Sequence, residues 1–390
     1  MRPWIRSVLA VLAGVAVCAA AASAAPEMRV RGLLDLGLVS SLKGDSLNRL
    51  TFGDSNFDPY RLHLFLDARL SPHLELHVQT ILHEGMNVIR ADGAYALWTP
   101  WLDRDLSLEA GKIPWPIGTY APRTYSDQNA LVGTPLIYQY RTSLAWATPA
   151  LSVDQQVAKA GTGQFAHDVT QHPYLPVVDE RWWDVGAVIV GSQRPLEFSL
   201  GVTQGSPSWP SPGPDNTPGN TYLGRLGLLP MPGLRFGISG ADGRWIPSWY
   251  EFALPPGADV RDYHETTLMG DAEFLRGPFE LRGEGARRRW QTVRTGTLGV
   301  DGGYAEARWS FPNGAWLAAR AEALRFSDVT TSAAVTRPWD DDVDRYEGVL
   351  GFRVTEAVRA KLAFQRTRRH PFAVDPLEDD LVAGSLSIRF

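Results

Sequence analysis

The sequence predicts an all-β protein, a closed antiparallel transmembrane β-barrel of sixteen strands. Amphipathic runs recur in an even rhythm along the chain, the first 25 residues read as an export signal, and the last run ends on Phe390. An alternation of period 2 places one face of each strand in hydrocarbon and the other face in a polar interior. Together these observations favour a membrane barrel over a soluble β-sandwich, whose strands also alternate.

The strands are predicted from alternating runs of about ten to twelve residues, a length that crosses a bilayer when the strand is tilted. The predicted runs are 28–40, 60–70, 74–84, 90–99, 106–114, 182–191, 195–205, 220–229, 233–242, 264–275, 279–290, 301–311, 315–326, 344–354, 358–368 and 380–390. Sixteen is an even number, as single-chain bacterial barrels have. The stretch 137–160 is an alternative source of two further strands, which would make eighteen.

Two features inside the runs agree with a barrel. Pairing the second run with the third across its turn places Arg69 opposite Glu75 and Asp67 opposite His77, and opposite charges across a ladder are mildly stabilising. Aromatic residues near the run ends fit the girdles that flank the hydrocarbon band. These residues are Tyr60, Trp98, Trp101, Trp182, Trp183, Trp290, Trp309, Phe311, Trp316 and Tyr346.

The connections alternate between tight and long. The tight turns at 71–73, 193–195, 231–233, 276–278 and 312–314 carry Pro, Gly, Asn or Ser, the residues that favour turns. The long connections at 41–59, 206–219, 243–263, 327–343 and 369–379 are polar or rich in Pro and Gly. Because the tight turns share one side of the alternation, we assign them to the periplasm and the long loops to the outside, with both chain ends in the periplasm.

The N-terminal residues predict a signal peptide over 1–25, which leaves 26–390 as a single barrel domain. Arg2 and Arg6 precede an apolar stretch at 8–22, and small residues follow it at the expected cleavage point. Removing these two arginines from 38 Lys and Arg leaves 36 against 43 Asp and Glu, a net charge of about −7. This balance excludes a broadly basic nucleic-acid binder, so no nucleic-acid partner is expected.

The final run, 380–390, alternates apolar and polar residues and stops on Phe390. Such a strand resembles the carboxy-terminal signature of Gram-negative outer-membrane β-barrels. The resemblance implies a location in the bacterial outer membrane, in contact with its lipid and lipopolysaccharide. It also implies recognition by the barrel-assembly machinery through the C-terminal strand, with Phe390 as the assembly signal.

The connection after the fifth run, from about 115 to 181, is much longer than the others. A loop of this length is uncommon unless it is functional. Pro114, Pro116, Pro122 and Pro135 stiffen its backbone. The lumen of a sixteen-stranded barrel is too wide for wall side chains to fill, so we expect the loop to enter the lumen. The alternative is an outer lid or a subunit-contact loop.

A sixteen-stranded exported barrel whose longest loop follows strand five resembles the Gram-negative porins, and is similar to the phosphate-selective porin group. The resemblance implies a third loop that narrows the lumen, and a water-filled channel for passive diffusion of small hydrophilic solutes or ions. It further implies a homotrimer. The ladder of basic loop residues expected for phosphate selectivity is not evident in this sequence. The alternative function is a non-conducting structural or adhesion barrel.

The candidate site residues fall into three sets. The predicted constriction loop presents Tyr120, Arg123, Tyr125, Asp127, Asn129 and Arg141. A predicted basic arc on the inner wall consists of Arg29, Arg31, Arg353, Arg359, Lys361 and Arg389. The other inward wall residues are Arg61, His63, Asp67, Glu75, Asp271, Glu273, Glu280, Glu284, Glu306 and Arg308. A basic arc facing acidic wall strands predicts a transverse field and a weak anion preference; local pairing of wall charges is the alternative.

No motif of the sequence indicates catalysis or a cofactor. The chain has no Gly-x-Ser-x-Gly elbow and no His-Glu-x-x-His pair. The Gly44–Leu47 stretch has the letters of a lipolytic motif without its strand-to-helix context. His63, His77 and His83 share a face but are offset along their strands, which does not suit a metal site. The acidic cluster at 340–344 is either a solvated loop or a site for Ca²⁺ and lipopolysaccharide cations.

Overall fold

The computed structural model describes residues 27–43, 60–83, 90–163, 174–179, 183–206, 208 and 219–390. The predicted signal peptide 1–25, the Gly44–Leu47 motif, Trp182 and the side chains of Tyr60 and His83 lie outside what is described. No helix of the described residues is long and apolar enough to span a membrane.

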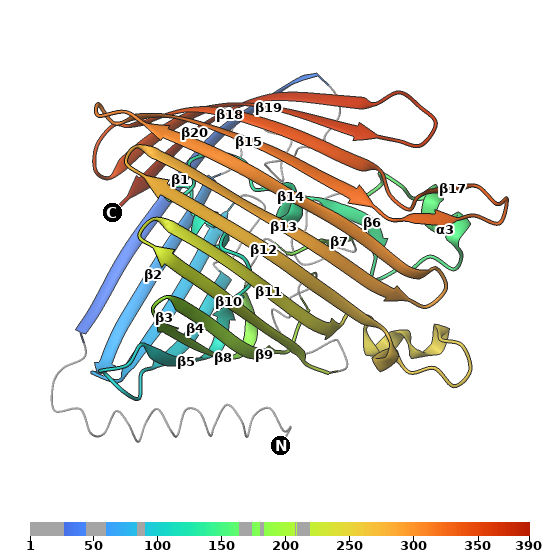
Figure 1. The fold of residues 1–390 in the computed structure, drawn as a ribbon, viewed down its shortest axis with the longest axis horizontal. Helices are drawn as coiled ribbons and strands as arrows, with labels where there is room; N and C mark the ends of the chain where they lie inside the picture. The colour runs from blue at the N-terminus through green and yellow to red at the C-terminus, as the bar shows by residue number, and fades with distance from the viewer. Residues whose placement is uncertain are drawn as a thin grey trace.

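Sixteen strands pair in sequence order around a closed antiparallel barrel, which confirms the predicted fold class (Figure 1). They are β1 (Glu27–Lys43), β2 (Tyr60–Ser71), β3 (Leu74–His83), β4 (Arg90–Trp98), β5 (Leu106–Pro114), β8 (Trp183–Gln193), β9 (Leu196–Thr203), β10 (Thr221–Met231), β11 (Leu234–Arg244), β12 (His264–Arg276), β13 (Phe279–Thr292), β14 (Gly296–Ser310), β15 (Ala315–Phe326), β18 (Asp342–Arg353), β19 (Val358–His370) and β20 (Leu377–Arg389). Closure joins β1 to β20, where the Gly32 N–H donates to the Phe390 carbonyl (2.7 Å) and the Phe390 N–H donates to the Gly32 carbonyl (3.0 Å).

The eighteen-strand alternative is wrong. β6 (Arg141–Ala145) and β7 (Tyr174–Pro176) pair only with each other, outside the barrel sheet. A second small hairpin, β16 (Asp328–Thr330) and β17 (Thr336–Pro338), extends from the loop between β15 and β18. The barrel therefore has the sixteen strands that the alternation predicted.

The predicted pairing between the second and third runs is correct. Arg69 lies opposite Glu75 and Asp67 lies opposite His77 in the β2–β3 ladder. Arg69 forms an ion pair with Glu75, with Nη2 at 2.6 Å, and His77 Nδ1 is hydrogen-bonded to Asp67 at 2.7 Å. Cross-strand charge pairing on the inner face thus contributes to this register.

The outer face carries an apolar band bordered by ion pairs. Exposed apolar side chains such as Leu281, Leu317, Leu350 and Phe364 point outward. Towards the ends of β13–β20 that lie away from the C-terminus, the outward side chains are charged and pair across neighbouring strands. These pairs are Arg287–Asp301, Arg325–Asp344, Arg366–Asp380 and Arg368–Glu378. Because an outward charge is costly in hydrocarbon, the pairs mark the edge of the apolar band.

Some of the predicted girdle aromatics face the wrong way for a girdle. Trp98, Trp309 and Tyr346 are exposed on the outer surface as expected. Trp290 and Trp316, by contrast, are buried inside the barrel. Trp316 donates its indole N–H to the Ala130 carbonyl of the long loop (3.0 Å). Position near a strand end therefore did not decide which face an aromatic takes.

The turns divide the barrel into two ends, which we call the short-turn end and the long-loop end. The C-terminus lies at the short-turn end (Figure 1). One connection departs from the predicted rule, because β13 and β14 are joined at the long-loop end by the three residues 293–295. Gly296, which follows with a φ of 77°, supplies the left-handed backbone that this tight reversal requires.

Gly351 lies opposite Trp316 in the β15–β18 ladder, and an added Cβ there would overlap the Trp316 indole. We expect Gly351→Ala to displace this ring, to break its bond to Ala130 and to lower the free energy of unfolding by about 1–3 kcal/mol. The matched control is Gly348→Ala on the same strand, because a Cβ at Gly348 meets nothing within 4 Å. Urea unfolding of the refolded barrels measures both, and equal stability of the two variants would contradict the tight packing at Trp316.

Candidate functional site

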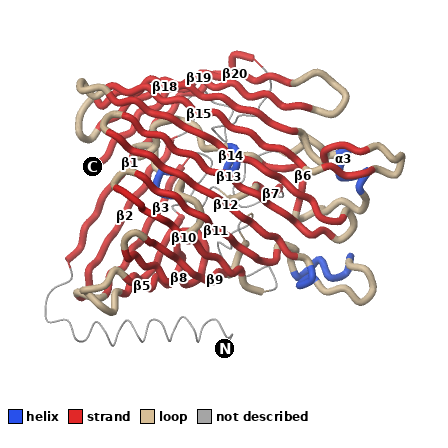
Figure 2. The backbone as a smooth tube through the Cα atoms, viewed as in Figure 1, coloured by secondary structure: helices blue, strands red, loops and turns tan. Residues whose placement is uncertain are grey.

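The connection between β5 and β8 folds into the lumen, which confirms the expected position of the long loop. It carries the 3₁₀ helix η1 (Ala121–Thr124), α2 (Leu136–Gln139), β6, α3 (Val153–Ala158) and β7. Helix α2 contacts the inner face of β14 and β15. Figure 2 shows short helical segments behind the barrel strands, near β13 and β14, whereas α3 lies beyond the strand ends at the side of the long loops. The loop therefore occupies the space that the wall side chains leave empty.

Carboxylates of the inner wall accept hydrogen bonds from the loop backbone. Glu284 on β13 accepts from the hydroxyl of Thr119 (2.7 Å) and from its N–H, and also from the Tyr138 hydroxyl. Glu322 on β15 accepts from the N–H of Leu136. An inserted loop must find partners for buried N–H groups, since a buried unpaired donor is costly. The acidic wall supplies them.

A second anchor lies on β15 and β18. Glu347 accepts from the N–H groups of Val132 (2.8 Å) and Gly133 (3.0 Å). Arg320 donates to the Glu347 carboxylate and to the Gly133 carbonyl, both at 2.8 Å. The loop, an acid and an arginine are thus joined in one buried network, in which each charge has a partner.

Arg123 anchors the loop and does not line the open lumen as predicted. It is only 6% exposed, forms an ion pair with Glu306, and donates to the Tyr304 hydroxyl at 2.8 Å. Its guanidinium also lies 5.2 Å from the ring centre of Tyr120. Asn129 is buried beside it and donates to the Tyr120 hydroxyl (3.1 Å). Arg123 thus binds a wall carboxylate, while Asn129 bonds within the loop, to Tyr120 and to the Gly133 carbonyl.

The remaining predicted loop residues, Asp127, Arg141 and Tyr125, each bind a different partner. Asp127 forms an ion pair with Arg389, which belongs to the predicted basic arc. Arg141 is paired to Asp179 at 3.0 Å and lines a cavity that remains between the loop and the wall. Tyr125 extends across that space and donates its hydroxyl to Gln79 on β3 at 2.5 Å.

Apolar packing completes the attachment of the loop to one half of the barrel. Trp115, Ile117 and Ile137 belong to a buried cluster that includes Met269 and Trp290 from the wall and side chains of the loop between β11 and β12. A second cluster joins Ala130 and Leu131 of the loop to inward residues of β15–β20. Because both clusters draw their wall residues from β10–β20, the described part of the loop packs against that half and leaves a cavity along β2–β9 and the neighbouring side chains of Arg225 and Arg235.

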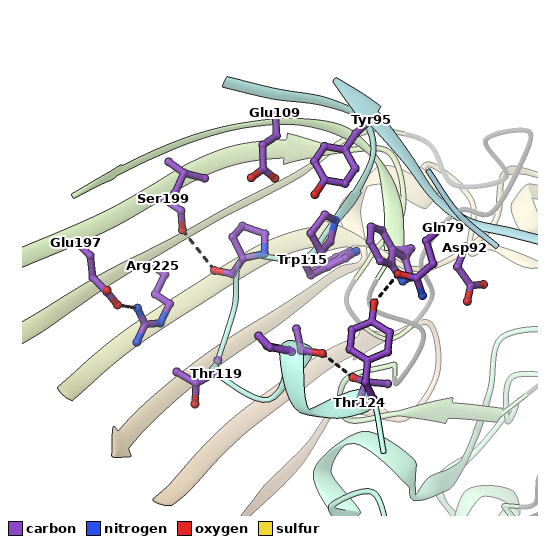
Figure 3. Close-up of a pocket in the computed structure, with 18 of the residues that line it drawn as sticks. Gln79, Asp92, Tyr95, Glu109, Trp115, Thr119, Thr124, Glu197, Ser199 and Arg225 are labelled. Carbon is purple, nitrogen blue, oxygen red and sulfur yellow. Dashed lines mark hydrogen bonds and ion pairs between the residues drawn. The ribbon is translucent and has the colours of Figure 1, made fainter. Parts of the chain in front are cut away.

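The open half contains a cavity of about 630 Å³ between the loop and the wall (Figure 3). At the long-loop end it reaches Arg61 and Asp92, and at the short-turn end it reaches Asp105, Ser192 and Arg235. Its middle is lined by wall side chains and by the loop. The residues between these ends include His63, Gln79, Tyr95, Trp115, Thr119, Tyr125, Trp183 and Arg225, whereas Glu109, Ser199 and Glu197 lie nearer the short-turn end, with Glu197 opposite Ser192.

A smaller cavity of about 420 Å³ lies next to the first, near β1–β4. The two cavities share Gln79, Tyr95, Tyr125 and Trp183. The hydrogen bond from Tyr125 to Gln79 therefore separates them. Of these four residues only Tyr125 was predicted to line the lumen. Trp183 was predicted as a girdle aromatic and lines the inner cavities instead, whereas Gln79 and Tyr95 alternate with apolar neighbours like any inward residue, so no sequence signal singled them out.

The predicted basic arc does not form one free patch. Arg31 is paired to Asp67 at 2.7 Å and Arg29 to Glu27 at 2.6 Å. Lys361 is buried under the loop, where it donates to two loop carbonyls. Arg353 has only the exposed Glu356 within ion-pair range, at 3.9 Å, and Arg359 has no ion pair among the described residues. Local pairing, the alternative weighed from the sequence, describes most of this arc.

The predicted acidic wall residues are also paired. Glu284 and Glu306 lie under the loop, as described above. Asp271 pairs with Arg225 at 2.6 Å, Glu273 with Arg282 at 2.7 Å and Glu280 with Arg308 at 3.4 Å. His63 contacts the Tyr125 ring edge-on, with ring centres 5.5 Å apart. Among the described residues, no three His, Cys, Asp or Glu side chains are grouped closely enough to hold a metal ion.

No protein-family model matches the chain, and a search of curated proteins finds no match. Solved structures do match. OmpT, an outer membrane protein of Vibrio cholerae, has a TM-score of 0.55 at 9% identity, over 94% of this chain and 98% of that one. OmpF of Salmonella typhi, solved as a complex with daunomycin, has a TM-score of 0.56 at 11% identity, over 93% and 97%. The chain has the fold of outer-membrane barrels.

A third match is DcaP, an outer membrane channel of Acinetobacter baumannii, with a TM-score of 0.56 at 6% identity over 94% of this chain and 98% of that one. At such low identity the likeness concerns the fold alone. The sixteen-stranded barrel is therefore shared with these proteins, while the residues that line the open half must be interpreted from this chain itself.

Replacing Arg123 tests its role as an anchor. We expect Arg123→Met to leave Glu306 without its closest counter-charge and to destabilise the barrel by about 3–5 kcal/mol, the usual cost of breaking a buried pair. The control is Arg276→Met, which removes an exposed arginine at the short-turn end of β12. Chemical unfolding measures both variants. If Arg123→Met changed the ion preference of the channel but not the free energy of unfolding, Arg123 would line the channel and would not be an anchor of the loop.

Asp340 gives a pH-dependent anchor in the loop between β17 and β18. It is buried and accepts the N–H groups of Ser143 (2.6 Å) and Gly161 (2.7 Å) of the long loop. It therefore holds the long loop and is not a solvated loop acid. Burial raises the pKa of Asp340 from 3.8 to about 6, although these N–H donors act in the opposite direction.

Because the folded protein binds this proton more tightly than the unfolded chain, stability falls as pH rises from about 4 to about 6 and then levels off. A shift of this size corresponds to about 3 kcal/mol. We expect the stability difference between wild type and Asp340→Asn to fall by about that amount over this window. The exposed Asp328→Asn serves as control. A pH-independent difference between wild type and Asp340→Asn would refute the assignment.

Proposed function

We propose that this protein is an outer-membrane porin, a channel for passive diffusion of small hydrophilic solutes or ions rather than an enzyme. The observation that carries the proposal is the cavity beside the long loop, which is lined by residues of both barrel ends, from Arg61 and Asp92 to Asp105 and Arg235. A sixteen-stranded barrel with a polar inner face and an apolar outer band suits a water-filled channel.

The alternative, a non-conducting structural or adhesion barrel, requires a sealed lumen. The described part of the long loop packs against β10–β20 and does not fill the opposite half. This arrangement favours conduction. The structures with the same fold include one described as an outer membrane channel, which agrees with the proposal.

The lining favours cations, in contrast to the anion preference expected from the basic arc. Four arginines and four carboxylates line the cavity: Arg61, Arg141, Arg225, Arg235, Asp92, Asp105, Glu109 and Glu197. Adding Asp179 and Asp271, the outer partners of Arg141 and Arg225, gives four positive and six negative charges. A net charge of −2 along the path attracts cations, and it opposes selectivity for phosphate.

Several further expectations accompany the proposal. A signal peptide over 1–25 exports the chain and leaves 26–390 as one barrel domain in the outer membrane. The barrel-assembly machinery recognises Phe390 and its strand, and the folded barrel contacts lipid and lipopolysaccharide. A homotrimer is expected from the resemblance to porins. These expectations rest on the sequence and remain predictions.

Planar-bilayer recording tests the channel. We expect refolded protein to form stable open channels, and a reversal potential of cation-selective sign in a potassium chloride gradient. Ser199→Trp, which adds a large ring to the inward face of β9, should lower the single-channel conductance by about half or more, because Ser199 lines the cavity opposite the loop and its hydroxyl donates to the Pro116 carbonyl at 3.4 Å. Thr297→Trp, on the outward face of β14, is the matched control.

The possible results separate the claims. No channels from correctly folded protein would reject the porin and favour the structural barrel. Channels with an anion-selective sign would reject the charge argument alone. Equal conductance of the Ser199 and Thr297 variants would show that ions pass somewhere other than the described cavity.

A further inference from the structure

One carboxylate in the open half, that of Glu109, has no ion pair among the described residues; His77 acts on it electrostatically but is itself bonded to Asp67 at 2.7 Å. Glu109 lies on the inward face of β5 and lines the cavity, and no described residue makes a hydrogen bond or ion pair with it. The nearby Glu197, by contrast, pairs with Arg225 and with Arg235. A half-buried carboxylate without an ion pair attracts a positively charged ligand.

Aromatic rings surround this carboxylate. Tyr95 is close enough to Glu109 to interact with it electrostatically, and its ring lies 6.3 Å from that of Trp183. Figure 3 shows the polar ends of Glu109 and Tyr95 turned towards the same space, next to Trp115. Aromatic faces beside a carboxylate are the environment that favours an organic cation, because the ring faces carry negative potential.

Trp115 adds an independent observation. It lines the same cavity and is only 3% exposed, yet its indole N–H has no acceptor among the described residues. A buried indole N–H usually has an acceptor, since the unpaired donor loses its bond to water. An oxygen atom of a bound ligand would satisfy it.

We propose that Glu109, Tyr95, Trp183 and Trp115 form a binding site for a small organic cation that also carries an acceptor oxygen, such as an amino alcohol. The ammonium group lies between the Glu109 carboxylate and the ring faces, and the oxygen accepts from the Trp115 indole. The site deepens the proposed function, since it names the solute class that the channel retains, and it rests on that function only for the route of entry.

The charge of Arg61 does not neutralise this site. In the β2–β3–β4–β5 ladders Glu109 lies in the row of Leu97, Glu75 and Arg69. Arg61 is eight residues from Arg69 along β2, which is about 26 Å at 3.3 Å per residue. At physiological ionic strength a charge is screened over about 8 Å. The cavity of about 630 Å³ is also within the size range of small-molecule sites.

Binding is measured by calorimetry on the full-length barrel refolded in detergent, so that the result does not depend on conduction. Choline is the probe, and 3,3-dimethyl-1-butanol, its uncharged carbon isostere, is the comparison. We expect choline to bind saturably and at least about tenfold more tightly than the isostere, because only choline carries the positive charge. Glucose, a neutral polyol, should not compete.

Two variants locate the site. Glu109→Gln should weaken choline binding by about tenfold or more, since the charge is lost at nearly constant shape. Glu356→Gln, in an exposed turn, is the matched control. Trp115→Phe keeps a ring and removes the N–H, so it should weaken choline binding but leave tetramethylammonium, which has no oxygen, unaffected.

Equal binding of choline and its isostere to the wild-type protein would overturn the proposal even if a variant failed to fold. Glucose competing as well as choline would assign the site to neutral polyols instead. Channels in bilayers without choline binding would reject the site and keep the porin. Choline binding without channels would keep the site and reject the porin.

Discussion

The hydrogen bonds from the long loop to the carboxylates of the inner wall determine how this barrel is organised. Glu284, Glu322 and Glu347 accept backbone N–H groups of the loop, and Glu306 holds Arg123. Because all four belong to β13–β18, the loop lies against that side of the barrel. The position of the open cavity on the opposite side follows directly from this choice.

Carboxylates on the wall hold a loop in a polar lumen with few side chains, because each one accepts several hydrogen bonds. A loop without regular pairing presents N–H donors along its length, and each buried donor needs an acceptor. A carboxylate offers two oxygens and accepts several donors at once, as Glu347 does with Val132, Gly133 and Arg320. The arginines in turn prevent the carboxylates from being buried unpaired.

Much of the barrel could be predicted from the sequence, because lipid on one face and water or polar groups on the other impose a strict alternation. The strands, the Arg69–Glu75 pairing and the position of the long loop follow from that alternation and from turn residues. The side of the lumen to which the loop attaches could not be predicted. Arg123 and Tyr125 are both polar loop residues close in sequence, yet one is buried against the wall and the other spans the open space.

The same limit explains the missed site residues. Glu109 differs from Glu284 only in what lies opposite it, and strand alternation carries no information on contacts across a lumen. The inward Trp290 and Trp316 illustrate this too, since a tryptophan near a strand end suits a lipid interface equally well. Contacts between segments far apart in sequence decide these cases.

The uneven filling of the lumen divides the inner wall into two regions that can change independently. On β13–β18 the inward residues Glu284, Glu322 and Glu347 bind the loop, so a substitution at one of them alters how the loop is attached. On β2–β10 most inward residues contact neighbours on the same wall and the open space, so substitutions can accumulate without displacing the loop. A chain of this design can therefore acquire a new solute through mutations on one half of its wall while the other half preserves its architecture.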